Sequence, residues 1–186
     1  MAATVRSCNY HPQALRSRRN SLPHDIAVNI ACSIIGSRLD YCNVIYFGIA
    51  EANFHKLQRI QNRAVRIVCD VPRRQQHSAD VLRQLHWLPM RSRVDFKLAV
   101  LRYKAYKLQQ PSYLADLLSS YQQPRDLRSS GLDLLSTEAS STTIGTRKFP
   151  CAAPVTWNTL PISVRSADSL TCFRSRLKTY LLSRHV

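Results

Sequence analysis

The strongest pattern of apolar and polar positions lies in residues 54–68. At about 100° per residue, its apolar side chains fall within one arc of about 160°, and its basic side chains fall within about 80° on the opposite side. This predicts an amphipathic helix with a basic outer face, which ends near Asp70 because Pro72 disfavours a helical conformation at Val71. The apolar positions are Phe54, Leu57, Ile60, Ala64, Val65, Ile67 and Val68, and the basic positions are Lys56, Arg59, Arg63 and Arg66.

The segment before this helix carries further helix signals. Pro23 suits the first turn of a helix that runs to about Gly36. Residues 38–47 are predicted to form a second helix, which Gly48 ends.

Residues 92–108 predict a helix with apolar side chains on two nearly opposite faces. Such a helix belongs between layers, which places it at the centre of a bundle. Trp87 could pack in this core or stack on a base of a bound nucleic acid, and the central position of the helix favours packing in the core. Before it, Ser78 is expected to cap a short helix that runs through Gln84. One face holds Val94, Leu98, Leu101, Ala105 and Leu108, and the other holds Phe96, Val100 and Tyr103.

The helical pattern stops after Tyr121. Residues 124–148 are rich in Ser, Thr and Arg and lack helical periodicity. Within them, residues 132–135 and 143–149 are expected to pair as a short hairpin or to form an ordered loop. The segment is also the natural linker between two parts of the chain.

Helical patterns return near the C-terminal end. A short helix over residues 152–160 presents Trp157, and Asp168 or Ser169 caps a last helix. The predicted fold is therefore mainly α, a helical bundle with a small C-terminal α-plus-β-hairpin unit. The apolar face of the last helix holds Leu170, Phe173, Leu177, Tyr180 and Leu181. The predicted segments are a basic N-terminal segment (1–20), a helical bundle (21–120), a linker or hairpin (121–149) and a C-terminal helical unit (150–186).

The net charge of the chain indicates which classes of molecule it binds. Its 27 basic and 11 acidic residues give a net charge of +16, and 45% of its 186 residues are hydrophobic, enough for a core. Such a charge attracts polyanions, nucleic acid first and acidic membranes second. Arginine supplies most of the basic residues, and its guanidinium group forms bidentate contacts with phosphate. The alternative is a solvated basic surface, or one that pairs with acidic parts of a neighbouring chain.

Other chemistries have little support in the sequence. Polymerase catalysis needs paired carboxylates to hold two metal ions, and the acidic residues here are scattered singly. Asp40, next to Leu39 and close to Arg38, is expected to form an ion pair or a cap. The six cysteines contain no C-x-x-C pair, so we expect no metal or other cofactor and predict reduced, buried thiols. No apolar run reaches the roughly 18 residues of a membrane span.

The first 24 residues allow two interpretations. They contain several Arg, Ser and Ala residues and no acidic residue before Asp25, as is typical of a mitochondrial transit peptide. Pro12, however, interrupts any amphipathic helix through this stretch. We therefore expect an intracellular protein of the nucleus or cytoplasm, with the mitochondrion as the alternative.

Several sequence motifs of the chain resemble one segment of the proteins of a known family. The motifs SRLDYCN (residues 37–43) and FHKLQRIQNRAVRIV (residues 54–68) are similar to the segment after the polymerase core of LINE-type, jockey-like non-LTR retrotransposon reverse transcriptases. The family's catalytic palm, which carries its paired aspartates, is absent from the chain. We therefore expect a non-catalytic fragment. The likeness continues in YHPQALRSRRNSL (10–22), HWLPMRSRVDFKL (86–98), PSYLADLL (111–118), FPCAAPVTWNTLP (149–161) and FRSRLKTYL (173–181).

The resemblance implies a way of binding nucleic acid. In this family the helices after the palm form the thumb, which holds the template–primer duplex by its backbone. Carried over, Arg59, Arg63 and Arg66 contact phosphates of an RNA or RNA–DNA duplex without reading bases, and Arg73 and Arg74 support them. A reverse-transcriptase palm domain is a second expected partner. The alternatives are a domesticated protein-interaction module or an unrelated basic component of an organelle ribonucleoprotein.

Overall fold

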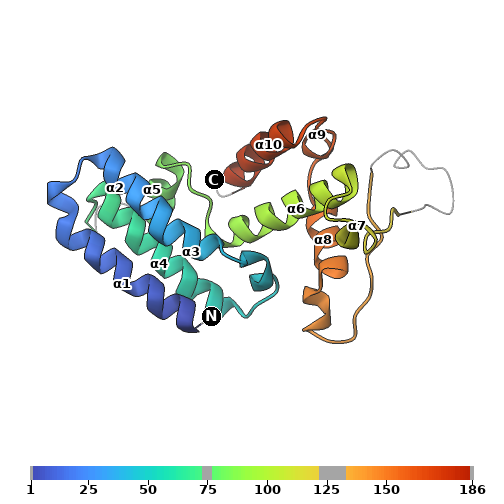
Figure 1. Cartoon of the computed structure of the whole chain (residues 1–186), viewed down its shortest axis with the longest axis horizontal. Helices are drawn as coiled ribbons and strands as arrows, with labels where there is room; N and C mark the ends of the chain where they lie inside the picture. Colours follow the sequence, from blue (N-terminus) through green and yellow to red (C-terminus); the bar gives the residue numbers. More distant parts are fainter. Residues whose placement is uncertain (1, 73–76, 122–132, 185–186) are drawn as a thin grey trace. The chain divides into compact units, whose positions relative to one another are not determined.

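Helices account for nearly all of the regular structure, as the sequence predicts (Figure 1). The chain forms two compact units, Met1–Val94 and Asp95–Arg184, and the boundary between them falls inside helix α6 (Met90–Leu108). This grouping differs from the division predicted from the sequence, which kept residues 21–120 in one bundle. The structure is a computed structural model, and it describes residues 2–72, 77–121 and 133–184.

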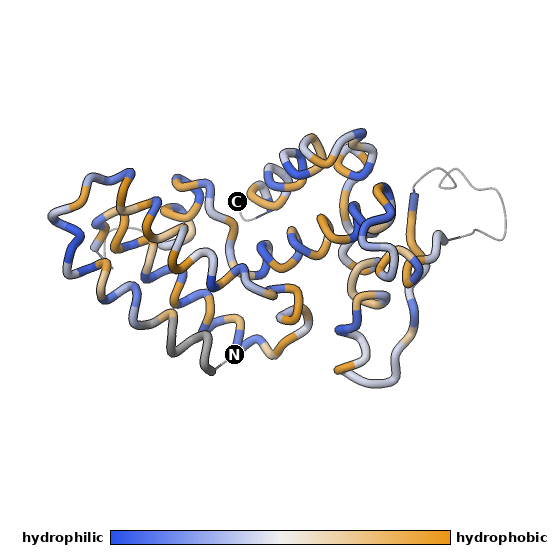
Figure 2. Tube along the Cα trace, viewed as in Figure 1, coloured by the Kyte–Doolittle hydropathy of each residue, from blue (hydrophilic) through white to orange (hydrophobic). Residues whose placement is uncertain are grey.

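The first unit is built around one long amphipathic helix, α4, which packs against α1, α2, the π-helical stretch η2 and α5. Figure 2 shows apolar and polar residues alternating along these helices, as expected where each helix buries one side. The elements are α1 (Ala2–Arg18), η1 (Arg19–Ser21), α2 (His24–Ile30), η2 (Ala31–Gly36), α3 (Ser37–Asp40), η3 (Asn43–Tyr46), α4 (Glu51–Cys69) and α5 (Ser78–Gln84).

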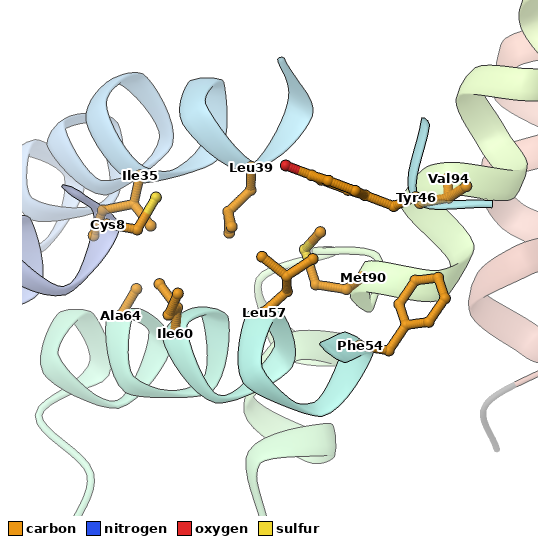
Figure 3. Close-up of a cluster of buried hydrophobic side chains, with 10 residues drawn as sticks. All are labelled: Cys8, Ile35, Leu39, Tyr46, Phe54, Leu57, Ile60, Ala64, Met90 and Val94. Carbon is orange, nitrogen blue, oxygen red and sulfur yellow. The ribbon is translucent and has the colours of Figure 1, made fainter. Parts of the chain in front are cut away.

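The main core of this unit lies between α4 and the helices that cover it (Figure 3). Ile35 and Leu39 point toward α4, where Leu57, Ile60 and Ala64 point back at them. Burial of each large aliphatic side chain contributes about 1.5–3 kcal/mol to the free energy of folding. The buried members of the cluster are Cys8, Ile35, Leu39, Tyr46, Phe54, Leu57, Ile60, Ala64, Met90 and Val94.

Helix α4 confirms the strongest prediction from the sequence. It ends at Cys69, and Asp70 follows in a left-handed conformation with a φ of 52°. The apolar arc is buried as predicted, except that Ile67 is only half-buried. The sequence analysis missed Gln61, which is 1% exposed. Its position within the apolar arc was a signal of burial, but its polar side chain excluded it from the apolar set.

The two helices predicted upstream of α4 are corrected by the structure. Residues 24–40 form one continuous helical stretch through α2, η2 and α3, so Gly36 does not end a helix. The predicted helix over residues 38–47 is wrong, because the chain leaves the helix after Asp40. Cys42 then adopts a left-handed conformation, with a φ of 51°, and a 3-10 turn follows. This reversal allows both Leu39 and Tyr46 to be buried in the same core.

The predicted interruption at Pro12 is also wrong. Pro12 lies inside helix α1 and is buried. A proline inside a helix removes one backbone hydrogen bond and costs about 3 kcal/mol in an isolated helix. The packing of α1 along α4 offsets this cost and buries Leu15 and Cys8.

The second unit confirms the predicted last helix. Ser169 caps α10, where its Oγ atom accepts a hydrogen bond from the Cys172 amide at 3.2 Å. Phe173 of this helix stacks on Tyr103 of α6, with the ring centroids 4.5 Å apart, and contacts the fully buried Trp157. The elements after α6 are α7 (Ser112–Ala115), η4 (Gly145–Arg147), α8 (Phe149–Asn158), α9 (Ile162–Arg165) and α10 (Leu170–Ser183).

The predicted hairpin does not form. Residues 143–149 make a turn, the 3-10 helix η4 and the start of α8. Leu135 instead forms an isolated antiparallel bridge with Ser120, while Leu132, at the start of the predicted strand, lies outside the described residues. The physical reason is that the backbone of Leu135 is bound by the side chain of Asn158.

Candidate nucleic-acid interface

An open cleft of about 1000 Å³ lies in the first unit, where the C-terminal end of α1 faces the outer side of α4. Among the described residues that line it, five are arginines and one, Asp70, is acidic. Because like charges gather there, the cleft is the part of this unit most suited to an anion. The arginines are Arg16, Arg19, Arg59, Arg63 and Arg66.

Three of these arginines are available to a ligand. Arg16 and Arg59 are exposed and Arg63 is half-exposed. No hydrogen bond or ion pair to another described residue involves any of the three. Arg59 and Arg63 are one helical turn apart on α4, and Arg16 reaches the same cleft from α1. The fold therefore brings guanidinium groups from two helices to one concave surface.

Arg66 has a different position from the one expected of a phosphate contact. Its Nε and Nη2 atoms donate to the Ser78 hydroxyl at 3.1 and 2.9 Å, and its Nη1 atom donates to the Pro72 carbonyl at 3.4 Å. These bonds tie α4 to the start of α5. Ser78 accepts hydrogen bonds from Arg66 and is the first residue of α5, and the residue before it, His77, makes no capping bond with its side chain. The prediction that Ser78 caps this helix is therefore wrong.

Arg19 fixes the opposite wall of the cleft. Its Nε atom donates to the carbonyls of Ile67 and Val68 at 3.1 and 2.9 Å, and its Nη1 atom donates to the Leu22 carbonyl at 2.9 Å. The carbonyls of the last turn of α4 lack partners within the helix and carry the negative end of its dipole, so a bound cation stabilises them. Arg19 thus joins the end of α1 to the end of α4.

Sequence reasoning located part of this site. The pattern of α4 identified Arg59, Arg63 and Arg66, and the structure brings all three to the cleft. Arg73 and Arg74 lie outside the described residues, so their role stays a prediction. Sequence reasoning missed the contribution of α1, although the basic run RSRRN at residues 16–20 was a visible signal.

The other candidate residues have structural roles. Asp40 forms an ion pair with Arg93, with 2.7 Å between Oδ2 and Nη1, which agrees with the ion pair predicted for it. Trp87 is half-buried and packs against the apolar clusters around Val68 and Val81, as a core residue should. Burial raises the pKa of the Cys69 thiol against the opposing influence of Arg19.

The described residues contain neither a metal site nor a membrane-spanning helix. Among the described residues, no group of three His, Cys, Asp or Glu side chains is placed to hold a metal ion. No described helix is both long and apolar enough to cross a bilayer. None of the six cysteines, all of which lie in the described residues, forms a disulfide bond. Cys32 and Cys42 are exposed, so the prediction of buried thiols is wrong for these two.

Comparisons with known proteins complete the description of the site. No protein-family model, curated protein or solved structure matches the chain.

Proposed function

We propose that the chain binds the sugar–phosphate backbone of an RNA or RNA–DNA duplex through the arginine-lined cleft, without reading base sequence. In this proposal it is a non-catalytic protein similar to the thumb and tail of a retrotransposon reverse transcriptase. The observation that carries the proposal is the convergence of Arg16, Arg59 and Arg63 from two helices on one open cleft. The net charge of +16 supports it by attracting polyanions over a distance.

The lining of the cleft favours backbone contacts over base contacts. Its described residues include arginines and the amides of Asn20 and Asn62, but no aromatic side chain. Binding of single strands depends on aromatic side chains on which bases stack. Arginine and amide groups suit phosphate oxygens and hydroxyl groups, which every nucleotide carries.

The spacing of the arginines suits a regular row of phosphates. Arg59 and Arg63 lie about 6 Å apart along the axis of α4, by helical rise. Arg16 adds a third cation from the facing helix. A duplex presents phosphates along two strands, so cations on two walls of a cleft can neutralise several phosphates together.

Equilibrium binding tests this proposal. A cleft variant, Arg16→Gln with Arg59→Gln and Arg63→Gln, is compared by fluorescence anisotropy with a control variant, Lys97→Gln with Arg174→Gln and Lys178→Gln. The control removes the same charge from exposed residues of the second unit. We expect the cleft variant to lose roughly tenfold or more in affinity for a mixed-sequence RNA–DNA duplex, and the control to lose far less. Equal losses in the two variants would mean that the cleft is not the binding site.

The proposal includes no catalytic step. Two-metal polymerase chemistry requires paired carboxylates, and the sequence contains no two adjacent acidic residues. We expect the purified chain to give no primer extension on an oligonucleotide-primed RNA with Mg²⁺ or Mn²⁺. Metal-dependent extension that copurifies with the chain would contradict this part of the proposal.

A further inference from the structure

Residues 133–136 of the second unit form a short non-helical segment that is held mainly by other parts of that unit. We call it the docked segment. Leu135 forms an antiparallel bridge with Ser120, the Ser136 amide donates to the Ser119 carbonyl at 2.9 Å, and the Tyr121 amide donates to the Leu134 carbonyl at 3.0 Å. The docked segment therefore pairs with residues 119–121 through one isolated antiparallel bridge. Backbone pairing of this kind is a common mode of peptide recognition.

Side chains of α8 hold the backbone of the docked segment. The Leu135 amide donates to Asn158 Oδ1 at 3.0 Å, and Asn158 Nδ2 donates to the Leu135 carbonyl at 3.0 Å. Trp157 Nε1 donates to the Asp133 carbonyl at 2.9 Å. These bonds satisfy the backbone of the segment from outside, so they do not depend on how the segment is connected to the rest of the chain.

Two side chains of the docked segment are also recognised. Leu135 is 2% exposed, so it fills an apolar site in the unit. The Asp133 carboxylate lies 3.8 Å from Arg102 Nη2 and 3.9 Å from Lys107 Nζ. The surrounding residues therefore select an acidic residue followed, two positions later, by leucine. We call Arg102, Trp157 and Asn158 the clamp.

The chain's own segment leaves hydrogen-bond donors of the clamp without acceptors among the described residues. Arg102 is fully buried, with its guanidinium carbon 3.3 Å from the Trp157 ring centroid and 4.3 Å from that of Tyr106. Its Nε, Nη1 and Nη2 atoms have no hydrogen-bond partner among the described residues. Burial lowers the pKa of Arg102 to about 9, against the raising influence of Asp133. A buried guanidinium with unused donors calls for a carboxylate at closer range.

The intrachain arrangement also constrains Asp133. Its φ of 47° lies in the left-handed region, which is unfavourable for a residue with a side chain, although Asp tolerates it better than most. In this conformation the carboxylate stays beyond hydrogen-bond distance of Arg102. A segment that enters the clamp from another chain is not bound to this conformation.

We propose that the clamp binds an Asp-x-Leu segment in trans, and that its partner is a second copy of this chain, whose residues 133–135 replace the chain's own. Residues 137–144, which follow the docked segment, contain no helix or strand. Exchange of an identical segment reuses the same backbone hydrogen bonds in both copies and lets Asp133 approach Arg102, so it is a low-cost route to a dimer.

Two complementary variants test the exchange. Leu135→Asp removes the apolar anchor of the docked segment and leaves the clamp intact, whereas Asn158→Ala removes the amide of the clamp and leaves the segment intact. We expect each variant alone to sediment as a monomer, and the equimolar mixture to contain a species of twice the monomer mass. A mixture that stays monomeric, with both variants helical by circular dichroism, would overturn the proposal.

A peptide experiment decides the case in which Leu135→Asp does not fold. A synthetic peptide of residues 131–138 is added to this variant, and the same peptide with Asp in place of Leu135 is the control. Because a ligand that binds only the folded state raises the melting temperature by mass action, the native peptide is expected to restore a cooperative melting transition. Restoration by neither peptide, or equally by both, would contradict recognition by the clamp.

Discussion

At the scale of single residues, two arginines one turn apart on α4 have different roles. Arg66 donates three hydrogen bonds to Ser78 and Pro72, whereas Arg63 faces the cleft. We predict that Arg66→Gln lowers the free energy of unfolding by about 1 kcal/mol, the net contribution of such bonds at a partly exposed site. Hydrogen exchange of the amides of α5 is the measurement. It should increase in Arg66→Gln and stay unchanged in Arg63→Gln, and an equal increase in both would refute the distinction.

A second residue-scale prediction concerns Gln61. Its Nε2 atom donates to the Leu88 carbonyl at 2.8 Å, and its side chain is almost fully buried. Gln61→Leu preserves the approximate volume and removes this hydrogen bond, but Arg93 Nε still donates to the same carbonyl at 3.0 Å. We therefore expect a cost of about 1 kcal/mol, the net contribution of one such bond. Chemical denaturation measures the loss. Lys56→Gln, at an exposed position of the same helix, is the control and should change stability by less than about 0.5 kcal/mol.

At the scale of helices, sequence reasoning succeeded where one face of a helix is uniformly apolar. Helices α4 and α10 follow this rule, so their extent and buried faces were predictable. It failed at Gly36 and Pro12, where local signals favour an end but packing against α4 continues the helix. Only the α4 side of the cleft could be predicted from the sequence. The spacing along α4 is visible in the sequence, whereas the approach of Arg16 depends on how α1 packs.

The packing of α1 makes a prediction about thiol reactivity. Cys8 of α1 is buried in the core beside Ile35 and Ala64, whereas Cys32 is exposed. Burial raises the pKa of Cys8, which reduces the thiolate that reacts with iodoacetamide. Peptide mass spectrometry of the briefly alkylated native chain should show Cys8 labelled roughly tenfold or more slowly than Cys32. Similar rates would show that α1 does not pack on α4, as expected of a transit peptide.

The same thiol gives a dependence of stability on pH. Because burial raises the pKa of Cys8 above its ordinary value of 9.0, the folded state keeps a proton that the unfolded state loses. Its contribution to stability is therefore complete below about pH 9 and is lost as the pH rises through the folded pKa. Thermal melting between pH 8 and pH 10 should show a smaller decrease for Cys8→Ala than for the natural chain. An identical decrease in both would show that Cys8 does not contribute.

At the scale of the whole molecule, the two units carry different proposed interactions. The first unit presents the arginine-lined cleft, and the second holds the clamp around residues 133–136. The two proposals rest on separate residues, so each can fail without the other. Binding of nucleic acid is the central claim, because the charge, the cleft and the motif resemblance all support it.

The dependence of affinity on salt tests that claim most directly. Each phosphate neutralised on a duplex contributes about −0.9 to the slope of log affinity against log salt concentration. Anisotropy titrations of one duplex at several salt concentrations should therefore give a slope that is flatter by about two to three units in the Arg16, Arg59 and Arg63 variant than in the natural chain. The control variant of the second unit should keep nearly the natural slope. The same slope in all three proteins, with helicity intact, would contradict the account and assign the contact to another surface.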